Sequence, residues 1–144
     1  MIKLLERLGV PRTLMLGFLA VAIFMTGDGF ELTFLSKFMV DQGFTSSQAS
    51  LLVTVYGLFA AFGGWSAGVL AEMFGARKVM MFGACWWIGV HLLFLGVAIP
   101  SHIYPLILGL YAIRGIGYPL FIYSFVVLMA QYISPSRLAS ATGF

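Results

Sequence analysis

The sequence predicts an all-α membrane protein with four transmembrane helices followed by the start of a fifth. Hydrophobic residues make up 61% of the 144 residues and charged residues only 9%, whereas a soluble domain carries about 25% charged residues. A large core cannot account for this deficit, because a soluble chain of this length still needs a polar surface. Four apolar stretches are long enough to cross a bilayer, which takes about 20 residues each.

The predicted helices begin and end at residues that suit helix boundaries. In chain order they are 13–39, 47–73, 79–99 and 104–133. The second opens after the capping-type residues Thr45 and Ser46. The third stops at Pro100, and the fourth stops at Ser134 and Pro135. The remaining residues, 134–144, are expected to form a cytoplasmic loop and the start of a fifth helix.

The distribution of basic residues predicts the orientation in the membrane. Six of the eight Lys and Arg residues fall on one side of the predicted bundle: Lys3, Arg7, Arg12, Arg77, Lys78 and Arg137. The positive-inside rule therefore makes residues 1–12 a cytoplasmic N-terminus, and the turns near Asp41 and His102 external.

Composition and spacing argue against several classes of function. The net charge is +3, but the basic residues are spread among short loops, so nucleic-acid binding is not expected. The single cysteine, Cys85, lies in an apolar run without metal-ligand spacing. We find no nucleophile with a placed base and no phosphate-binding loop, so we expect no enzyme, no cofactor and no metal.

A short charged turn separates the second and third predicted helices. Between Asp41 and Arg114 the chain has only three formal charges, and all lie in this turn, which reads Gly-x-x-x-Glu-x-x-Gly-x-Arg-Lys over Gly68, Glu72, Gly75, Arg77 and Lys78. An acidic residue at a helix C-terminus is unfavourable unless cations neutralise it, and the two basic residues are close enough to do so. The second glycine suits the left-handed conformation that ends many helices.

This spacing closely resembles the loop 2–3 signature of the major facilitator superfamily, G-x-x-x-D-R-x-G-x-R-R/K. Glu72 stands where the family usually has Asp, and Met73 where it has Arg, so one cation of the family's charge cluster is replaced. In that family the loop takes part in charge contacts that hold one conformational state. The stretch Arg114–Pro119 is similar to the family's intramembrane Arg-plus-Gly signature, and Ala139–Gly143 resembles the opening of its fifth helix.

The resemblance implies the N-terminal part of a twelve-helix secondary transporter whose C-terminal half is missing from the chain. Within the superfamily, Gly27–Ser36 resembles the first helix of the polyol permease group, which includes ribitol and arabinitol permeases and an oxoglutarate permease relative. These likenesses imply proton-coupled symport of a small polar solute, such as a polyol or sugar, across the bacterial inner membrane.

Three charged residues lie inside predicted spans and form the candidate coupling site. Asp28 and Glu31 share a helix face, and Asp28 and Arg114 both lie about 15 Å from the outer end of their helices. A charge at the bilayer centre costs roughly 2.5–3.5 kcal/mol, so we expect Arg114 to pair with one carboxylate. One carboxylate would exchange a proton during transport; the alternative is a static ion pair that holds the bundle.

Aromatic residues flank the predicted site. Tyr111 and Tyr118 lie at helical spacing on the face of Arg114, where their hydroxyls could bind a polyol or sugar, although membrane packing is an equally open role. His91 could act as a proton relay, but a structural role is favoured, because the resemblance implies that the third helix is peripheral.

Two other functions stay open at this point. The length and the buried carboxylate also suit a small four-helix multidrug exporter acting as a homodimer, although the charged turn, Arg114 and the unfinished fifth helix argue against it. A non-transporting, truncated remnant is the second alternative, since a chain without a second six-helix half cannot rebuild alternating access alone.

Overall fold

The computed structural model describes residues 12–133, and four helices within them are long and apolar enough to cross a membrane. They span Leu14–Asp41, Ser46–Phe74, Ala76–Ser101 and Tyr104–Tyr132. The predicted all-α membrane fold class is therefore confirmed. The predicted cytoplasmic N-terminus with Lys3 and Arg7, the predicted loop with Arg137 and the start of a fifth helix lie outside the described residues.

The third and fourth membrane helices are each assembled from shorter segments. The elements are α2 (Arg12–Asp41), α3 (Ser46–Phe74), α4 (Ala76–Leu93), the π-helical turn η1 (Phe94–Ala98), α5 (Ile99–Ser101), α6 (Tyr104–Arg114) and α7 (Gly117–Tyr132). The third membrane helix joins α4, η1 and α5, and the fourth joins α6 and α7. Both interruptions precede a proline, and a hinge or kink at Pro119 is expected from the sequence, whereas the π-helical turn is not.

The start of α3 is fixed by a reciprocal cap. The backbone N–H of Gln48 donates to Thr45 Oγ1 at 3.2 Å, and the backbone N–H of Thr45 donates to Gln48 Oε1 at 2.9 Å. These two bonds satisfy donors that a helix N-terminus otherwise leaves unpaired. Of the two capping-type residues identified in the sequence, Thr45 is therefore the N-cap of α3.

The turn from α3 to α4 is a single residue, Gly75. Its φ of 91° and ψ of 130° lie in a region that favours glycine, outside the left-handed helical conformation expected from the sequence. The N–H of Gly75 donates to Ala71 O at 3.0 Å, and its own carbonyl accepts from Lys78 N at 3.1 Å. The two membrane helices thus follow each other almost without a loop.

The π-helical turn η1 accommodates Pro100 near the end of the third membrane helix. A proline within a helix has no N–H to donate, and its ring clashes with the carbonyl four residues earlier. Here the N–H of Ile99 donates to Phe94 O, five residues back, which widens the turn before the proline. The sequence predicted that the helix stops at Pro100, but the helix continues to Ser101.

The fourth membrane helix breaks at Gly115 and Ile116, ahead of Pro119. The N–H of Gly115 donates to Ala112 O at 2.9 Å, a tight final turn that ends α6. The indole Nε1–H of Trp86 in α4 donates to Ile113 O at 2.9 Å. The same carbonyl also accepts from Ile116 N at 3.3 Å, so the indole is a second donor that joins α4 to the break.

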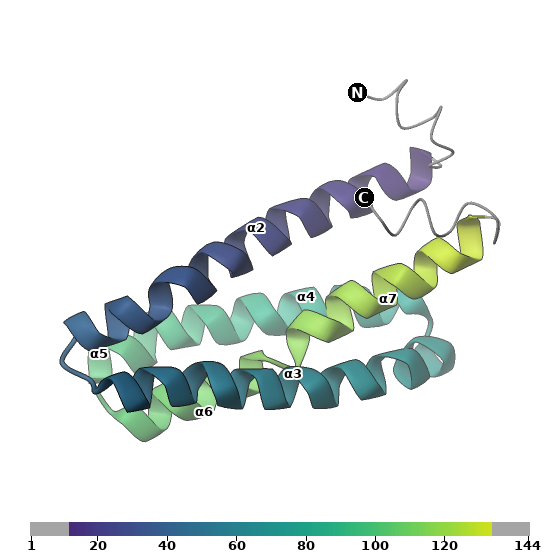
Figure 1. Ribbon diagram of the computed structural model, residues 1–144. Helices are drawn as coiled ribbons and strands as arrows, with labels where there is room; N and C mark the ends of the chain where they lie inside the picture. Colours follow the sequence, from purple (N-terminus) through teal and green to yellow (C-terminus); the bar gives the residue numbers. More distant parts are fainter. Residues whose placement is uncertain (1–11, 134–144) are drawn as a thin grey trace.

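The four membrane helices form an antiparallel bundle with the fourth at its centre (Figure 1). In that helix 56% of the apolar stretch is buried, against 11% in the first. In Figure 1, α2 meets α3 at the turn between them. At its N-terminal end α2 packs against α7, where Leu14 forms a buried cluster with Phe125 and Met129. The Gly75 turn, the start of α2 and the end of α7 lie at the same end of the bundle.

Close contact between α4 and α7 depends on two glycines that face each other. A Cβ built on Gly117 would lie 2.8 Å from Gly83 O, and one built on Gly83 would lie 2.9 Å from Gly117 O. Both distances are below ordinary van der Waals contact, so neither position tolerates a side chain without a shift of the helices. This crossing holds the broken part of the fourth membrane helix against the third.

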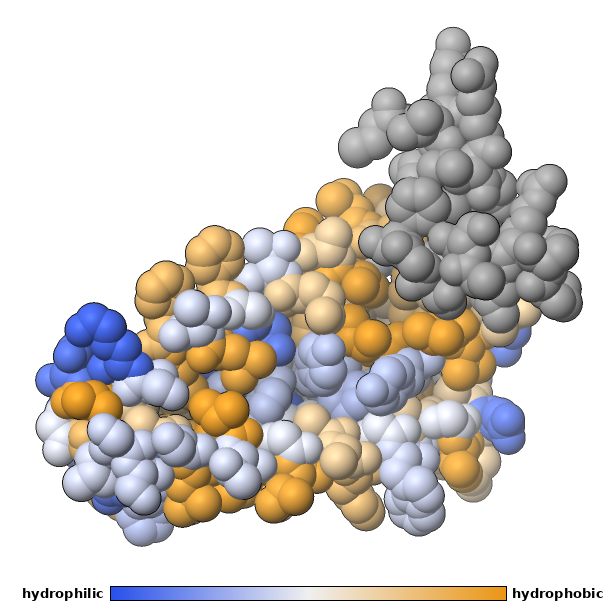
Figure 2. Space-filling view, in the orientation of Figure 1, coloured by the Kyte–Doolittle hydropathy of each residue, from blue (hydrophilic) through white to orange (hydrophobic). Residues whose placement is uncertain are grey.

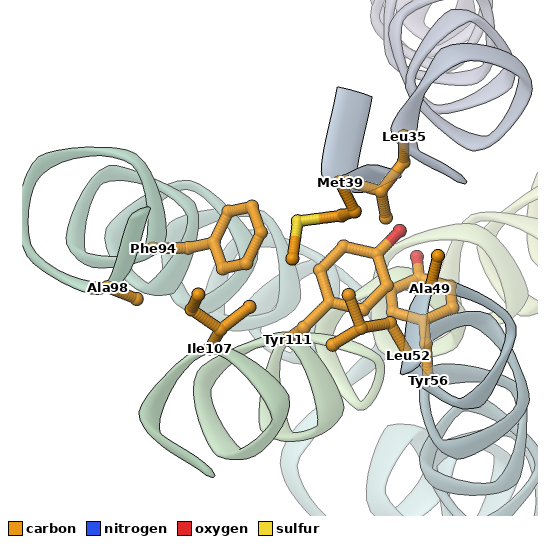
Figure 3. Close-up of a cluster of buried hydrophobic side chains, with 9 residues drawn as sticks. All are labelled: Leu35, Met39, Ala49, Leu52, Tyr56, Phe94, Ala98, Ile107 and Tyr111. Carbon is orange, nitrogen blue, oxygen red and sulfur yellow. The ribbon is translucent and has the colours of Figure 1, made fainter. Parts of the chain in front are cut away.

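A buried cluster at the α2–α3 turn end contains residues from four segments (Figure 3): Leu35, Met39, Ala49, Leu52, Tyr56, Phe94, Ala98, Ile107 and Tyr111. Figure 2 shows hydrophobic side chains over much of the outer face, with strongly hydrophilic residues at both ends of the bundle. Leu16 is 79% exposed and Trp65 78% exposed. An outer face of this kind suits lipid or further protein in a membrane.

Candidate functional site

Arg114 is the largest fully buried side chain of the described chain, with an exposed fraction of 0%. It is the last residue of α6, directly before the break in the fourth membrane helix. A helix C-terminus carries partial negative charge from its unpaired carbonyls, so the backbone itself favours a cation at this position. The local fold therefore explains why an arginine can be placed here.

Two carboxylates from one face of α2 lie beside the guanidinium. Arg114 Nη1 donates to Glu31 Oε1 at 2.6 Å, and Arg114 Nη2 lies 3.6 Å from Asp28 Oδ1. The side chain of Glu31 is 17% exposed and that of Asp28 is 8% exposed. The helical spacing of three residues lets both carboxylates reach the same cation, so a single arginine is shared between them.

A tyrosine from α3 completes the shell of Asp28. The hydroxyl of Tyr56 donates to Asp28 Oδ1 at 3.1 Å, and the tyrosine is itself buried. In Figure 3 the hydroxyl groups of Tyr56 and Tyr111 point in the same direction, toward the helix that carries Leu35. Asp28 is therefore held by two helices besides its own.

Three aromatic rings enclose the guanidinium of Arg114. Its Cζ atom lies 4.5 Å from the ring centroid of Trp87, 4.6 Å from that of Tyr111 and 5.3 Å from that of Tyr56. Cation–π contacts of this kind contribute up to about 2 kcal/mol each where water is excluded. The rings come from three different helices, so the cation links α3, α4 and α6.

His91 of α4 also reaches the guanidinium. Its Nδ1 atom lies 2.6 Å from Arg114 Nη1 and 3.8 Å from Glu31 Oε2. The imidazole stacks on Trp87 with the ring centroids 4.9 Å apart. His91 was expected to be structural, and the structure places it instead in direct contact with the charged cluster.

Several polar groups of the site have no hydrogen-bond partner within the described residues. They are the Nε and Nη2 atoms of Arg114, the hydroxyl of Tyr111 and the indole nitrogen of Trp87. Buried donors without partners are costly, at about 1–3 kcal/mol each. The site therefore has unused capacity to donate hydrogen bonds to a ligand oxygen.

An apolar pocket of about 460 Å³ adjoins the cluster between α2 and α4. Glu31 and His91 line it together with Trp87, and its other walls are mostly apolar side chains. The pocket thus borders the charged cluster through the side chains of Glu31 and His91.

The structure brings together four of the five residues that the sequence singled out as a coupling site. Asp28, Glu31 and Tyr111 each lie beside the guanidinium of Arg114. Tyr118 is directed elsewhere: its hydroxyl lies 3.5 Å from the sulfur of Met25. The predicted helical spacing fails because the helix breaks between Arg114 and Tyr118.

Sequence reasoning missed Tyr56, Trp87 and His91 as members of the site. A histidine inside a membrane span is by default a functional candidate, and this signal was available for His91. Tyr56 and Trp87 carry no charge and lie in apolar helices rich in aromatic residues. Nothing in their local sequence distinguishes them from packing residues.

The charged turn lies at the opposite end of the bundle from the α2–α3 turn (Figure 1). Gly68, Glu72, Gly75, Arg77 and Lys78 are all exposed. Among the described residues, the ion pairs do not include one between Glu72 and either basic residue. The neutralisation of Glu72 within the turn, which the spacing suggested, is thus not formed here.

The chain belongs to the major facilitator superfamily. A family model described as Major Facilitator Superfamily matches residues 16–144. The prediction made from the charged turn and the fourth membrane helix is therefore confirmed. No solved structure matches the chain.

Relatives of the chain include two polyol transporters of Klebsiella pneumoniae. A ribitol transporter is 46% identical over 94% of this chain, and a D-arabinitol transporter is 45% identical over 95%. An alpha-ketoglutarate permease of Bacillus subtilis (strain 168) is 40% identical over 99% of this chain. The chain spans about a third of the length of these relatives, at 32%, 32% and 33% respectively. The predicted likeness to the polyol permease group is confirmed, and the relatives are named as transporters and not as enzymes.

Proposed function

We propose that the chain forms part of a secondary active transporter that couples protons to symport of a small polar solute, such as a polyol or sugar. The observation that carries this proposal is the fully buried Arg114, which shares two carboxylates and keeps donors without partners. Each charge at this depth costs roughly 2.5–3.5 kcal/mol. A cluster built only for stability would be expected to satisfy every one of its donors.

The geometry suggests how binding and protonation would be coupled. While both carboxylates are charged, they compete for the same guanidinium. A proton on one of them would weaken its attraction to Arg114 and leave an Nη group for a solute hydroxyl. Tyr111, whose hydroxyl is buried and without a partner, would supply a further donor or acceptor beside the cation. We also propose that Tyr118, which lies on the other side of the helix break, contacts the solute.

The relatives support a small polar solute. Two are named for polyols and one for a dicarboxylate. A polyol would accept hydrogen bonds from the uncharged donors of Tyr111 and Trp87. A dicarboxylate would pair directly with Arg114. We favour a polyol or sugar, because Arg114 already has two carboxylate neighbours and a further anion would compete with them.

We propose that the remaining partners are the lipid bilayer and a C-terminal half that would complete the transport pathway. Alternating access in this class of transporter needs two repeated halves, and this chain supplies one part of them. We propose that the protein lies in a bacterial inner membrane. The positive-inside rule then favours a cytoplasmic Gly75 turn and N-terminus. Glu72, Arg77 and Lys78 are exposed at that end. There they would contact the second half in one conformational state.

The test is uptake of radiolabelled ribitol, D-arabinitol and alpha-ketoglutarate by cells expressing the complete protein that carries this chain. We expect the wild-type protein to take up one of these three solutes. Asp28→Asn, Glu31→Gln and Arg114→Gln should each abolish the proton-driven uptake of that solute. Asp41→Asn is the matched control, because Asp41 is a carboxylate on the same helix with a 59% exposed side chain. Normal coupled uptake in all three variants would reduce the cluster to a static ion pair. No uptake by the wild-type protein would favour the non-transporting remnant.

A further inference from the structure

We propose that His91 is the group that takes the transported proton, and that its protonation moves Glu31 from Arg114 to the imidazole. This inference rests on the proposed proton coupling and assigns the proton to the imidazole of His91 in place of a carboxylate. It is carried by one geometric relationship: His91 Nδ1 and Glu31 Oε1 each lie 2.6 Å from the same nitrogen of Arg114.

The contact with Arg114 sets the protonation state of the imidazole. A guanidinium can only donate hydrogen bonds, so the nitrogen that it approaches must carry a lone pair. Nδ1 of His91 is therefore unprotonated in this arrangement, and the ring is neutral with its proton on Nε2. The two hydrogens of Arg114 Nη1 are then both used, one by Glu31 and one by His91.

A proton on Nδ1 would make this arrangement unstable. Two donors would face each other at 2.6 Å, and both groups would be cations. Glu31 Oε2 already lies 3.8 Å from Nδ1, so a small rotation would give the imidazolium a carboxylate partner. Arg114 would keep Asp28, which is 3.6 Å from its Nη2 atom, and would be released from Glu31.

Protonation of His91 would also change the net charge of the buried cluster. Besides its helix neighbours, the imidazole faces Glu31 from α2 and Arg114 from α6. Asp28, Tyr56 and Tyr111 lie around the same guanidinium. With both carboxylates ionised and the imidazole neutral, two negative charges and one positive charge give a net charge of −1. A proton on His91 brings the net charge of the cluster to zero, which lowers the cost of burying it.

The members of the cluster differ in how exposed they are to an incoming proton. The side chains of His91 and Glu31 are 23% and 17% exposed, whereas that of Arg114 is 0% exposed. His91 and Glu31 also line the pocket of about 460 Å³, so a proton would meet them before it met Arg114. The stacking of the imidazole on Trp87 keeps its ring plane fixed at the pocket wall.

The first test is nitrogen-15 NMR of the histidine-labelled complete protein in bilayers. The resonances absent from the His91→Asn variant identify His91. We expect an unprotonated Nδ1 and a protonated Nε2 at neutral pH, with both nitrogens protonated after acidification. A ring protonated on Nδ1 at neutral pH would contradict the proposal.

The second test separates a switch from a positioning residue. In His91→Asn the amide oxygen lies near the place of Nδ1 and can accept from Arg114, but it cannot take a proton. We expect this variant to keep solute exchange across the membrane and to lose the stimulation of uptake by a proton gradient. His91→Leu removes the acceptor as well and should lose both. His102→Asn is the control, since asparagine tolerates the left-handed conformation of His102, with φ of 53°.

The outcomes distinguish this inference from the function on which it rests. If wild-type uptake responds to a proton gradient and His91→Asn responds equally, the proton binds elsewhere and this inference fails alone. Wild-type uptake that ignores the proton gradient would overturn the proposed coupling together with the switch.

Discussion

Arg114 and Glu31 are 83 positions apart in the chain, yet Arg114 Nη1 and Glu31 Oε1 are 2.6 Å apart in the bundle. This contact joins the first membrane helix to the centre of the fourth. It is notable because α2 is otherwise the least buried of the four membrane helices. The charged pair therefore defines how the outer helix sits against the rest of the bundle.

Removing Arg114 should strongly destabilise the protein. Arg114→Gln leaves two buried carboxylates without their cation, and breaking a buried pair in this way costs about 3–5 kcal/mol. The measurement is thermal or denaturant unfolding in detergent. The triple variant that also carries Asp28→Asn and Glu31→Gln should recover most of the loss, because it leaves no uncompensated charge.

The control for this prediction is an exposed ion pair on the same helix. Lys37 Nζ lies 2.9 Å from Asp41 Oδ2, with side chains 77% and 59% exposed. Lys37→Gln should change the stability by about 0–1 kcal/mol. Equal losses from Arg114→Gln and Lys37→Gln would contradict the buried-pair interpretation.

The hydroxyl of Tyr56 should matter more than that of Tyr118. Tyr56→Phe removes the donor to buried Asp28, and hydrogen bonds to charged groups contribute about 1.5–3 kcal/mol. Tyr118→Phe removes only a contact to the sulfur of Met25, a weak acceptor, and should cost less than about 0.5 kcal/mol. Unfolding of the two variants under identical conditions checks the difference, and the reverse order would contradict the site geometry.

The crossing of α4 and α7 should not tolerate a methyl group at Gly117. In Gly117→Ala the new Cβ would lie 2.8 Å from Gly83 O and 2.9 Å from Trp87 N, so the helices must separate at a cost of about 1–3 kcal/mol. Gly89→Ala is the matched control, because nothing lies within 4 Å of its Cβ position. That variant should be neutral or slightly stabilising. Unfolding experiments that rank the two in the opposite order would refute the close crossing.

Trp86 should stabilise the broken fourth helix through its indole nitrogen. Trp86→Phe removes the side-chain donor to Ile113 O but leaves the bond from Ile116 N, so we expect a loss of about 0.5–1.5 kcal/mol. Trp65→Phe, at a side chain 78% exposed, should have almost no effect. Hydrogen exchange of the amides from Gly115 to Leu120 is the more direct readout, and we expect it to rise in the Trp86 variant alone.

The sequence was sufficient to predict an all-α fold with four membrane-length helices. Length and hydropathy define a span, and a rise of about 1.5 Å per residue converts position into depth. This is why Arg114 could be placed at the level of the carboxylates before the helices were assembled. The capping residues before α3 also located the start of that helix to within one position.

The rotation of each helix about its axis could not be predicted in the same way. A helix that is apolar on all sides has no polar face that would fix which residues point inward. His91 was expected to be structural because the family resemblance makes the third helix peripheral, yet it faces Arg114. Tyr118 was placed on the face of Arg114 because regular spacing was assumed across a break that Pro119 and the close glycine contacts produce.

The break in the fourth membrane helix also places two short backbone dipoles end to end in the middle of the bundle. α6 presents its electronegative carbonyl end at Arg114, and α7 presents its electropositive amide end at Gly117. The main chain thus produces a local electric field that persists whatever side chain occupies position 114. Lysine there would remain compatible with that field, whereas glutamate would oppose it as well as repel Asp28 and Glu31.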